Sequence, residues 1–201
     1  MGTIGAWVLD QALTDWTRWR EDFPALTLNV NLSVRQLRQP DLVDTVAKAL
    51  LRHRTDPAAV CLELTESVLM DDAGGPTTPC GTLQRLHDLG VRLAIDDFGT
   101  GYSSLAYLRR FPIDLLKIDR QFTAGLGRVP QDRAIVATII HLGHALGLTV
   151  TAEGVETADQ LAELQRLGCD QAQGFHLAHP QPAELLEDLL RSRRRRSNVT
   201  A

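Results

Sequence analysis

The stretch Arg92–Leu105 reads RLAIDDFGTGYSSL and contains the features that decide the fold. A short apolar run ends in two adjacent aspartates, and a glycine-punctuated loop then leads into a segment with helical periodicity. A strand followed by polar residues and a helix is typical of a βα unit. The apolar run is nearly continuous, as expected for a strand that is covered on both faces of a parallel sheet.

The same pattern recurs along the chain from Thr27 onward. It predicts strands at Thr27–Ser33, Val60–Leu64, Arg92–Asp96, Leu115–Asp119, Thr149–Ala152 and Asp170–Gln173. It predicts helices at Asp41–Arg54, Thr82–Leu89, Ser103–Leu108, Asp132–Leu146, Asp159–Leu167 and Ala183–Leu190. Repeated βα units favour an α/β fold with a parallel sheet, either doubly wound or closed into a (β/α)₈ barrel of typically about 250 residues.

The N-terminal stretch Ile4–Trp19 has helical periodicity, and no strand is expected before it. A barrel built from this chain would therefore lack its opening strand. We expect one domain over residues 1–190, an incomplete TIM-like barrel, and a basic, disordered tail over residues 191–201.

Composition narrows the class of protein. The chain has 201 residues, of which 44% are hydrophobic, with no apolar run of about 18 residues and no signal peptide, so we expect a cytoplasmic protein without a membrane segment. The formal charge is −4, and without the five arginines near the C-terminus it is about −9, which argues against nucleic acid as a partner. The three cysteines lack C-x-x-C spacing and are expected to be reduced thiols.

Polar side chains gather where the predicted strands end. The carboxyl ends of parallel strands lie at one rim of the sheet, so these groups should converge there. They are Asn31, Glu63, Asp96, Asp97, Lys117, Asp119, Glu153, Glu156 and Gln173.

Four of these groups are hard oxygen donors that suit magnesium, manganese or calcium: Asn31, Glu63, Asp96 and Asp97. Adjacent aspartates at a strand end can bind two metals about 3.5–4 Å apart, because one bridges both ions and its neighbour binds the second. That arrangement serves in-line attack on phosphorus.

Lys117 is one of only two lysines and lies two residues before Asp119, so both side chains should point to the same side of the strand. The ammonium group could orient an attacking water or neutralise charge on a phosphate. An ion pair with Asp119 or Glu153 is an equally open interpretation. A third interpretation is that the chain is a lyase or enolase-like barrel in which Lys117 acts as a base or Schiff-base nucleophile beside magnesium.

The remaining candidates are weaker. The loop Asp97–Ser104 could be a simple turn or a mobile flap over a ligand. The pairs His141/His144 and His176/His179 lack a third metal ligand nearby and are interpreted as structural histidines.

Seven segments, in order, resemble those of EAL domains, the bacterial cyclic di-GMP phosphodiesterases, and the resemblance runs from about Gly5 to Leu190. They are IGAWVLDQA (Ile4–Ala12), VNLS (Val30–Ser33), LELTES (Leu62–Ser67), DDFGTGYSSL (Asp96–Leu105), LKID (Leu116–Asp119), AEGVET (Ala152–Thr157) and QGF (Gln173–Phe175).

This resemblance implies a role for each matching residue. The first metal would be held by Asn31, Glu63 and Asp96, and the second by Asp96 and Asp97. Asp119 would support a metal-bound water, and Lys117 would position or polarise the attacking water. Glu153 would fix the geometry of the substrate and the water.

The resemblance also implies ligand contacts for Glu156 and Gln173. Glu66 would brace the flap Phe98–Ser104, which also helps to form a homodimer in such proteins. The implied reaction is hydrolysis of one phosphodiester of cyclic di-GMP to linear pGpG with two magnesium or manganese ions, whereas calcium would inhibit.

The chain departs from the family pattern at its start, because no Glu-Ala-Leu motif with its metal-binding glutamate occurs before Asn31. Three explanations are open: a trimmed fragment or misplaced start, a strand supplied from elsewhere, and a degenerate domain. In the last case, the domain would be a catalytically inactive cyclic di-GMP receptor or regulatory scaffold.

Overall fold

The computed structural model describes residues 3–66, 78–101, 108 and 110–197. Its core is a parallel sheet in which each strand pairs with the next along the chain. The strands are β1 (Leu28–Asn31), β2 (Val60–Thr65), β3 (Arg92–Phe98), β4 (Leu115–Ile118), β5 (Thr149–Ala152) and β6 (Gln171–Ala172).

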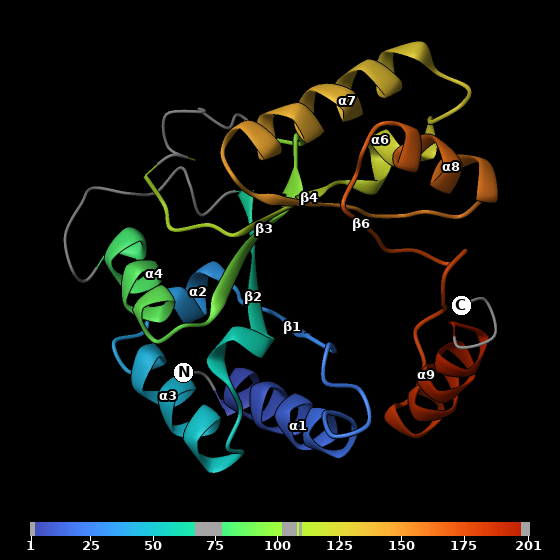
Figure 1. The fold of residues 1–201 in the computed structure, drawn as a ribbon. Coiled ribbons are helices and arrows are strands. Elements are labelled where there is room, and N and C mark those ends of the chain that lie inside the picture. The colour runs from blue at the N-terminus through green and yellow to red at the C-terminus, as the bar shows by residue number, and fades with distance from the viewer. Residues whose placement is uncertain (1–2, 67–77, 102–107, 109, 198–201) are drawn as a thin grey trace.

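Helices surround the outer side of this curved sheet, and Figure 1 shows α7 and α8 at one end of the curve and α1, α3 and α4 at the other. The helical elements are α1 (Thr3–Trp19), α2 (Val34–Leu37), α3 (Leu42–Arg52), η1 (Pro57–Ala59), α4 (Pro79–Asp88), α6 (Arg120–Ala124), α7 (Pro130–Ala145), α8 (Ala158–Arg166) and α9 (Ala183–Ser197). The predicted α/β class and incomplete TIM-like barrel are confirmed, and among the described residues no strand precedes β1.

Alternation along the strands separates two faces of the sheet. The outer face carries apolar side chains that pack against the helices in the main core, including Leu62, Leu93, Leu116 and Val150. The inner face carries a second, small apolar cluster of Cys61, Ala94 and Leu115. The residues two positions further along these three strands are Glu63, Asp96 and Lys117, so the inner face becomes charged towards the carboxyl ends.

Three glycines lie directly after the ends of helices. Gly90, Gly147 and Gly168 follow the C-caps of α4, α7 and α8 with φ of 92°, 75° and 78°. A side chain at these left-handed positions would be strained, so glycine allows the chain to turn directly into the next strand.

The C-terminal helix is longer than the sequence analysis expects. Helix α9 continues through Ser197, past the expected end at Leu190. Arginine is a good helix former, and Arg191 also pairs with Glu187 one turn earlier at 2.8 Å and with Asp22 at 3.1 Å.

Smaller differences concern short elements. The helices α2 and α6 and the 3₁₀ turn η1 were not expected, because each is too short to show periodicity. The helix expected at Ser103–Leu108 lies outside the described residues except for Leu108. No described helix has the length and hydropathy needed to cross a membrane.

Candidate metal and substrate site

Lys117 lies at the centre of a cluster of carboxylates on the inner face of the sheet. Its Nζ is 2.6 Å from Glu153 Oε1, 2.9 Å from Glu63 Oε2 and 3.1 Å from Asp96 Oδ1. These acids come from β2, from β3 and from the residue after β5, so the predicted convergence of strand ends brings them together. The side chain of Lys117 is only 3% exposed, which removes its charge from bulk water.

The electrostatics of the cluster keep this lysine charged. Burial by itself would lower the pKa of Lys117, but hydrogen bonds to Glu153 and Glu63 and their negative charges outweigh it and raise the pKa above the usual range. A Schiff-base nucleophile needs a neutral amine, so the lyase interpretation is disfavoured. Among the ion pairs of the described residues, Lys117 contacts Glu153 and not Asp119.

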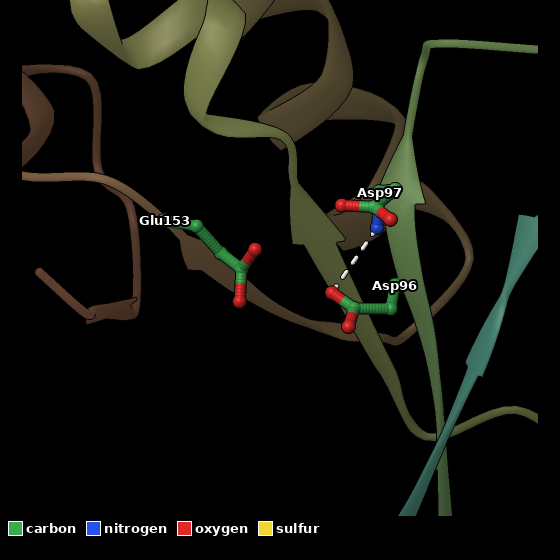
Figure 2. Close-up of side chains that lie close together, drawn as sticks. All are labelled: Asp96, Asp97 and Glu153. Atoms are coloured by element: carbon green, nitrogen blue, oxygen red, sulfur yellow. Dashed lines mark hydrogen bonds between the residues drawn. The ribbon is translucent and has the colours of Figure 1, made fainter. Parts of the chain in front are cut away.

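A bulge in β3 explains how two adjacent aspartates serve one site. The register with β4 shifts between Ile95 and Phe98, and Asp97 has a left-handed φ of 56°. Neighbouring residues of a regular strand point to opposite faces, and the bulge removes this restriction. Figure 2 shows the carboxylates of Asp96, Asp97 and Glu153 directed into the same space.

The crowding of these carboxylates suits a cation. One oxygen from each of Asp96, Asp97 and Glu153 lies within 4.8 Å of the others. The pKa of Asp97 is raised by burial, by a hydrogen bond with Asp119, and by repulsion from Asp96 and Asp119. Burial likewise raises the pKa of Glu153, against the opposing effect of Lys117. Bound divalent cations would relieve this repulsion, so the donor set fits hard metal ions.

Strand β1 adds two amides to the site. Asn31 is paired in register with Glu63, which places it at the same level of the rim. Asn29 donates from Nδ2 to Glu63 Oε1 at 2.7 Å and so orients this carboxylate. Asn29 was missed by sequence reasoning, although its spacing of two residues from Asn31 on one strand is a signal that both share a face.

Glu66 holds the start of the flap. Its Oε2 accepts hydrogen bonds from the backbone N–H groups of Gly99 at 2.9 Å and Gly101 at 3.2 Å, and the residue is 5% exposed. A Cβ atom at position 101 would lie 2.8 Å from Glu66 Oε1, so a larger residue there would displace this carboxylate. The predicted contact between Glu66 and the flap exists in its described part, and residues 102–104 lie outside the described residues.

Asp119 and the remaining candidates surround the cluster. Asp119 caps α6 by accepting from the Gln121 N–H at 2.7 Å. A pocket of about 170 Å³ lies next to the carboxylates and shares Glu153 with them. Its lining includes the predicted Glu156 and Gln173, together with Arg120 and Phe175, which sequence reasoning did not select as site residues.

Two of the four discounted histidines, His144 and His179, make structural contacts. His144 Nε2 lies 3.0 Å from Asp170 Oδ2, and the ring of His179 stacks on Phe175 with 4.5 Å between centroids. Among the described residues, no histidine belongs to a cluster with metal-ligand geometry.

Comparison with known proteins places this site in a family context. The sequence model of the EAL domain family matches residues 1–180 of this chain. The bifunctional diguanylate cyclase/cyclic di-GMP phosphodiesterase MucR of Pseudomonas aeruginosa is 48% identical over 184 residues, which cover 91% of this chain and 26% of that protein. The chain spans about a quarter of the length of the curated relatives it matches first.

Solved structures show the same fold. The MucR phosphodiesterase in complex with c-di-GMP matches with a TM-score of 0.85 at 48% identity, over 91% of this chain and 73% of that one. The EAL domain of Mycobacterium smegmatis DcpA matches with a TM-score of 0.87 at 42% identity, over 95% of this chain and 85% of that one. A calcium/c-di-GMP complex of Klebsiella pneumoniae BlrP1 matches with a TM-score of 0.78 at 31% identity, over 88% of this chain and 44% of that one. The matched length, the identity and the shared fold together show that this chain belongs to the EAL domain family.

Proposed function

We propose that this chain hydrolyses one phosphodiester bond of cyclic di-GMP and releases linear pGpG. The observation that carries this proposal is the gathering of Glu63, Asp96 and Glu153 around Lys117 at the carboxyl ends of three strands. Two relatives, MucR and BlrP1, are described in complex with c-di-GMP, which supports the choice of substrate.

Two divalent cations, magnesium or manganese, would be held by this site. One would be bound by Asn31, Glu63 and Asp96, and the other by Asp96 and Asp97. When bound, such ions supply a water of lowered pKa and neutralise charge on the phosphate. The raised pKa of Asp97 and the mutual proximity of the carboxylates support this assignment, because a cation favours their ionised forms.

The chain's own groups would position the reactants. Lys117 keeps its proton and can donate hydrogen bonds to the attacking water or to a phosphate oxygen, while Glu153 orients the ammonium group from 2.6 Å. Asp119 would hold a metal-bound water from the beginning of α6. Glu156 and Gln173 would contact the ligand in the adjoining pocket.

The surroundings of the site belong to the same proposal. Glu66 would keep the flap Phe98–Ser104 in place over the substrate, and two copies of the protein would meet near the loop Asp97–Ser104. The reaction would take place in the cytoplasm, where cyclic di-GMP acts as a second messenger.

The test is incubation of the chain with cyclic di-GMP and Mn²⁺, followed by chromatography of the nucleotides. We expect pGpG to accumulate with Mn²⁺ or Mg²⁺, to be suppressed by Ca²⁺, and to fall at least a hundredfold in Asp96→Asn, since a metal ligand is lost. Asp88→Asn is the matched control, because Asp88 is an exposed acid at the end of α4.

A folded wild-type chain that forms no pGpG at any Mn²⁺ concentration would refute hydrolysis. Calorimetry with Ca²⁺ then separates the remaining cases. Binding of cyclic di-GMP without product would favour the receptor or scaffold alternative, whereas the absence of binding would remove both functions.

A further inference from the structure

Arg120 brings a cationic group to the pocket beside the carboxylate cluster. The pocket is lined by Arg120, Glu153, Glu156, Gln173 and Phe175, with backbone from two glycines. Arg120 is exposed, so its guanidinium group is accessible to a ligand. Among the described residues that line this pocket, it is the only arginine or lysine.

The position of Arg120 is determined by its backbone neighbours. It is the first residue of α6, directly after the capping Asp119. Gly154 has a left-handed φ of 66°, and a Cβ atom there would lie 2.4 Å from the Arg120 Cβ. The stem of Arg120 therefore packs closely against the loop that follows β5, and the same loop carries Glu153 and Glu156.

The charges in the pocket favour a base over a phosphate as the partner of Arg120. Two carboxylates, those of Glu153 and Glu156, line the pocket and would repel a phosphate. Lys117 engages Glu153 at 2.6 Å, which leaves Glu156 and Arg120 as the opposite charges of the outer pocket. A planar ligand with hydrogen-bond donors on one edge and acceptors on another would satisfy both groups.

Guanine has this pattern. Its O6 and N7 are acceptors that match the bidentate fork of an arginine, and its N1–H and N2–H groups are donors that match a carboxylate. Adenine presents an amino group where guanine presents O6, so it would place a donor against the guanidinium donors.

An aromatic surface lies in the same pocket. Phe175 is 55% exposed, and its ring is stacked on His179 with 28° between the ring planes. An exposed ring supported from behind is a suitable platform for a nucleobase. The pocket thus offers a flat apolar surface together with edge-reading polar groups.

We propose that Arg120 is a specificity-determining residue that donates hydrogen bonds to O6 and N7 of one guanine of the ligand. This inference rests on the proposed function for the identity of the ligand, and it concerns base recognition and not the chemical step. Loss of Arg120 should weaken binding while turnover of bound substrate changes little, because the contact is the same in the ground state and the transition state.

The experiment compares Arg120→Gln and Arg120→Lys with wild type on three ligands: cyclic di-GMP, its 7-deazaguanine analogue, and cyclic di-AMP. Calorimetry in Ca²⁺ gives Kd without turnover, and steady-state assays in Mn²⁺ give KM and kcat. We expect Arg120→Gln to raise Kd and KM for cyclic di-GMP about tenfold with kcat nearly unchanged, as for loss of one bidentate base contact. Arg120→Lys should recover little of this loss, because an ammonium group lacks the planar fork.

The analogues locate the contact. The 7-deaza ligand lacks N7, so wild type should bind it more weakly than cyclic di-GMP. Arg120→Gln should then cause only a small further loss of affinity for this ligand. The same two results are expected for cyclic di-AMP. Arg85→Gln, an exposed arginine on α4, controls for the change in net charge and should leave all constants unchanged.

Three results would overturn the inference. The first is that Kd and KM do not change in Arg120→Gln. The second is an equal loss of affinity for all three ligands that Arg120→Lys restores, which would indicate a phosphate contact. The third is that wild type binds none of the ligands. Wild type that binds cyclic di-GMP without hydrolysing it would refute the proposed function alone, since the comparison of Kd values still tests Arg120.

Discussion

At the scale of single residues, the site depends on a buried ammonium group among carboxylates. Each of Glu63, Asp96 and Glu153 contributes an oxygen within 3.1 Å of Lys117 Nζ. Removing one partner of a buried ionic cluster is costly because the remaining charges lose both water and counter-charge. Lys117 therefore stabilises the fold of the site in addition to its proposed role with the substrate.

The substitution Lys117→Met keeps the aliphatic stem and removes the charge. Without divalent cations, the free energy of unfolding should fall by about 3 kcal/mol or more, as for other buried pairs that are broken on one side. Added Mn²⁺ should raise the melting temperature of the variant more than that of wild type, because the cation replaces the missing positive charge. Denaturation with and without Mn²⁺ measures both effects.

Lys48→Met is the control, since Lys48 is exposed on α3 and should change stability by less than about 0.5 kcal/mol. Equal stability of Lys117→Met and wild type in the absence of metal would show that the ammonium group does not hold the carboxylates.

The identity of these residues could be predicted from the sequence, but their geometry could not. Asn31, Glu63 and Asp96 are recognisable because each ends an apolar run. The partners of Lys117 depend on side-chain directions across three strands, and the left-handed Asp97 depends on a bulge, which no periodicity reveals. Arg120 follows Asp119 directly in the sequence, yet only its close packing against Gly154 shows that it borders the pocket that Glu153 and Glu156 line.

At the scale of elements, short polar contacts attach loops and strands to the sheet. Glu66 accepts hydrogen bonds from the backbone N–H groups of Gly99 and Gly101. Its buried carboxylate thus takes the place of water at these two groups. Asp170 plays a similar part between α7, β5 and β6, because its Oδ2 accepts from the Val150 N–H at 2.8 Å and lies 3.0 Å from His144 Nε2.

Glu66→Ala should loosen the beginning of the flap. Loss of the acceptor leaves two N–H groups without their carboxylate, so their amide protons should exchange with solvent at least tenfold faster, and kcat for cyclic di-GMP should decrease. Exchange measured residue by residue at Gly99 and Gly101 checks this. Glu21→Ala, an exposed acid after α1, is the control. Unchanged exchange at both glycines would contradict the role of Glu66.

Asp170→Asn should destabilise the fold at neutral pH by about 1 kcal/mol, the typical net value of a hydrogen bond. Burial alone would raise the pKa of Asp170, but the Val150 N–H and His144 lower it below its ordinary value of 3.8. A carboxyl whose folded pKa is lowered stabilises the protein above its unfolded pKa, and this stabilisation is lost as pH falls through the folded pKa.

The difference between wild type and Asp170→Asn should therefore be present in full at about pH 5 and shrink as the pH falls below 3.8. Urea denaturation at a series of pH values measures it. If the difference in the free energy of unfolding instead grew below pH 3.8, the stabilising role of the Asp170 carboxylate would be contradicted.

At the scale of the whole molecule, the parallel sheet is open between β1 and β6. The βα repeat, the order of the elements and the absence of a strand before β1 among the described residues could all be predicted, because they follow from hydrophobic patterns. The length of α9 could not, since a run of arginines resembles a solvated tail in the sequence alone, whereas in the structure Arg191 pairs with Glu187 and Asp22.

An open sheet should not be uniformly stable. Strands β2, β3 and β4 have neighbours on both sides and are mostly buried, whereas β1 and β6 each have one neighbour. We expect the slowest amide exchange in β2–β4, near the rate set by global unfolding, and faster exchange by local opening in β1 and β6. Equal protection of the edge and central strands in native-state exchange would indicate that an additional partner covers the edges.

Anomalous X-ray scattering from crystals of the chain grown with Mn²⁺ would locate the bound metal ions. Two manganese peaks are expected at the carboxyl ends of the strands, one in contact with Asn31, Glu63 and Asp96 and one in contact with Asp96 and Asp97. Manganese bound elsewhere while these side chains remain without metal at saturating Mn²⁺ would contradict the proposed metal site.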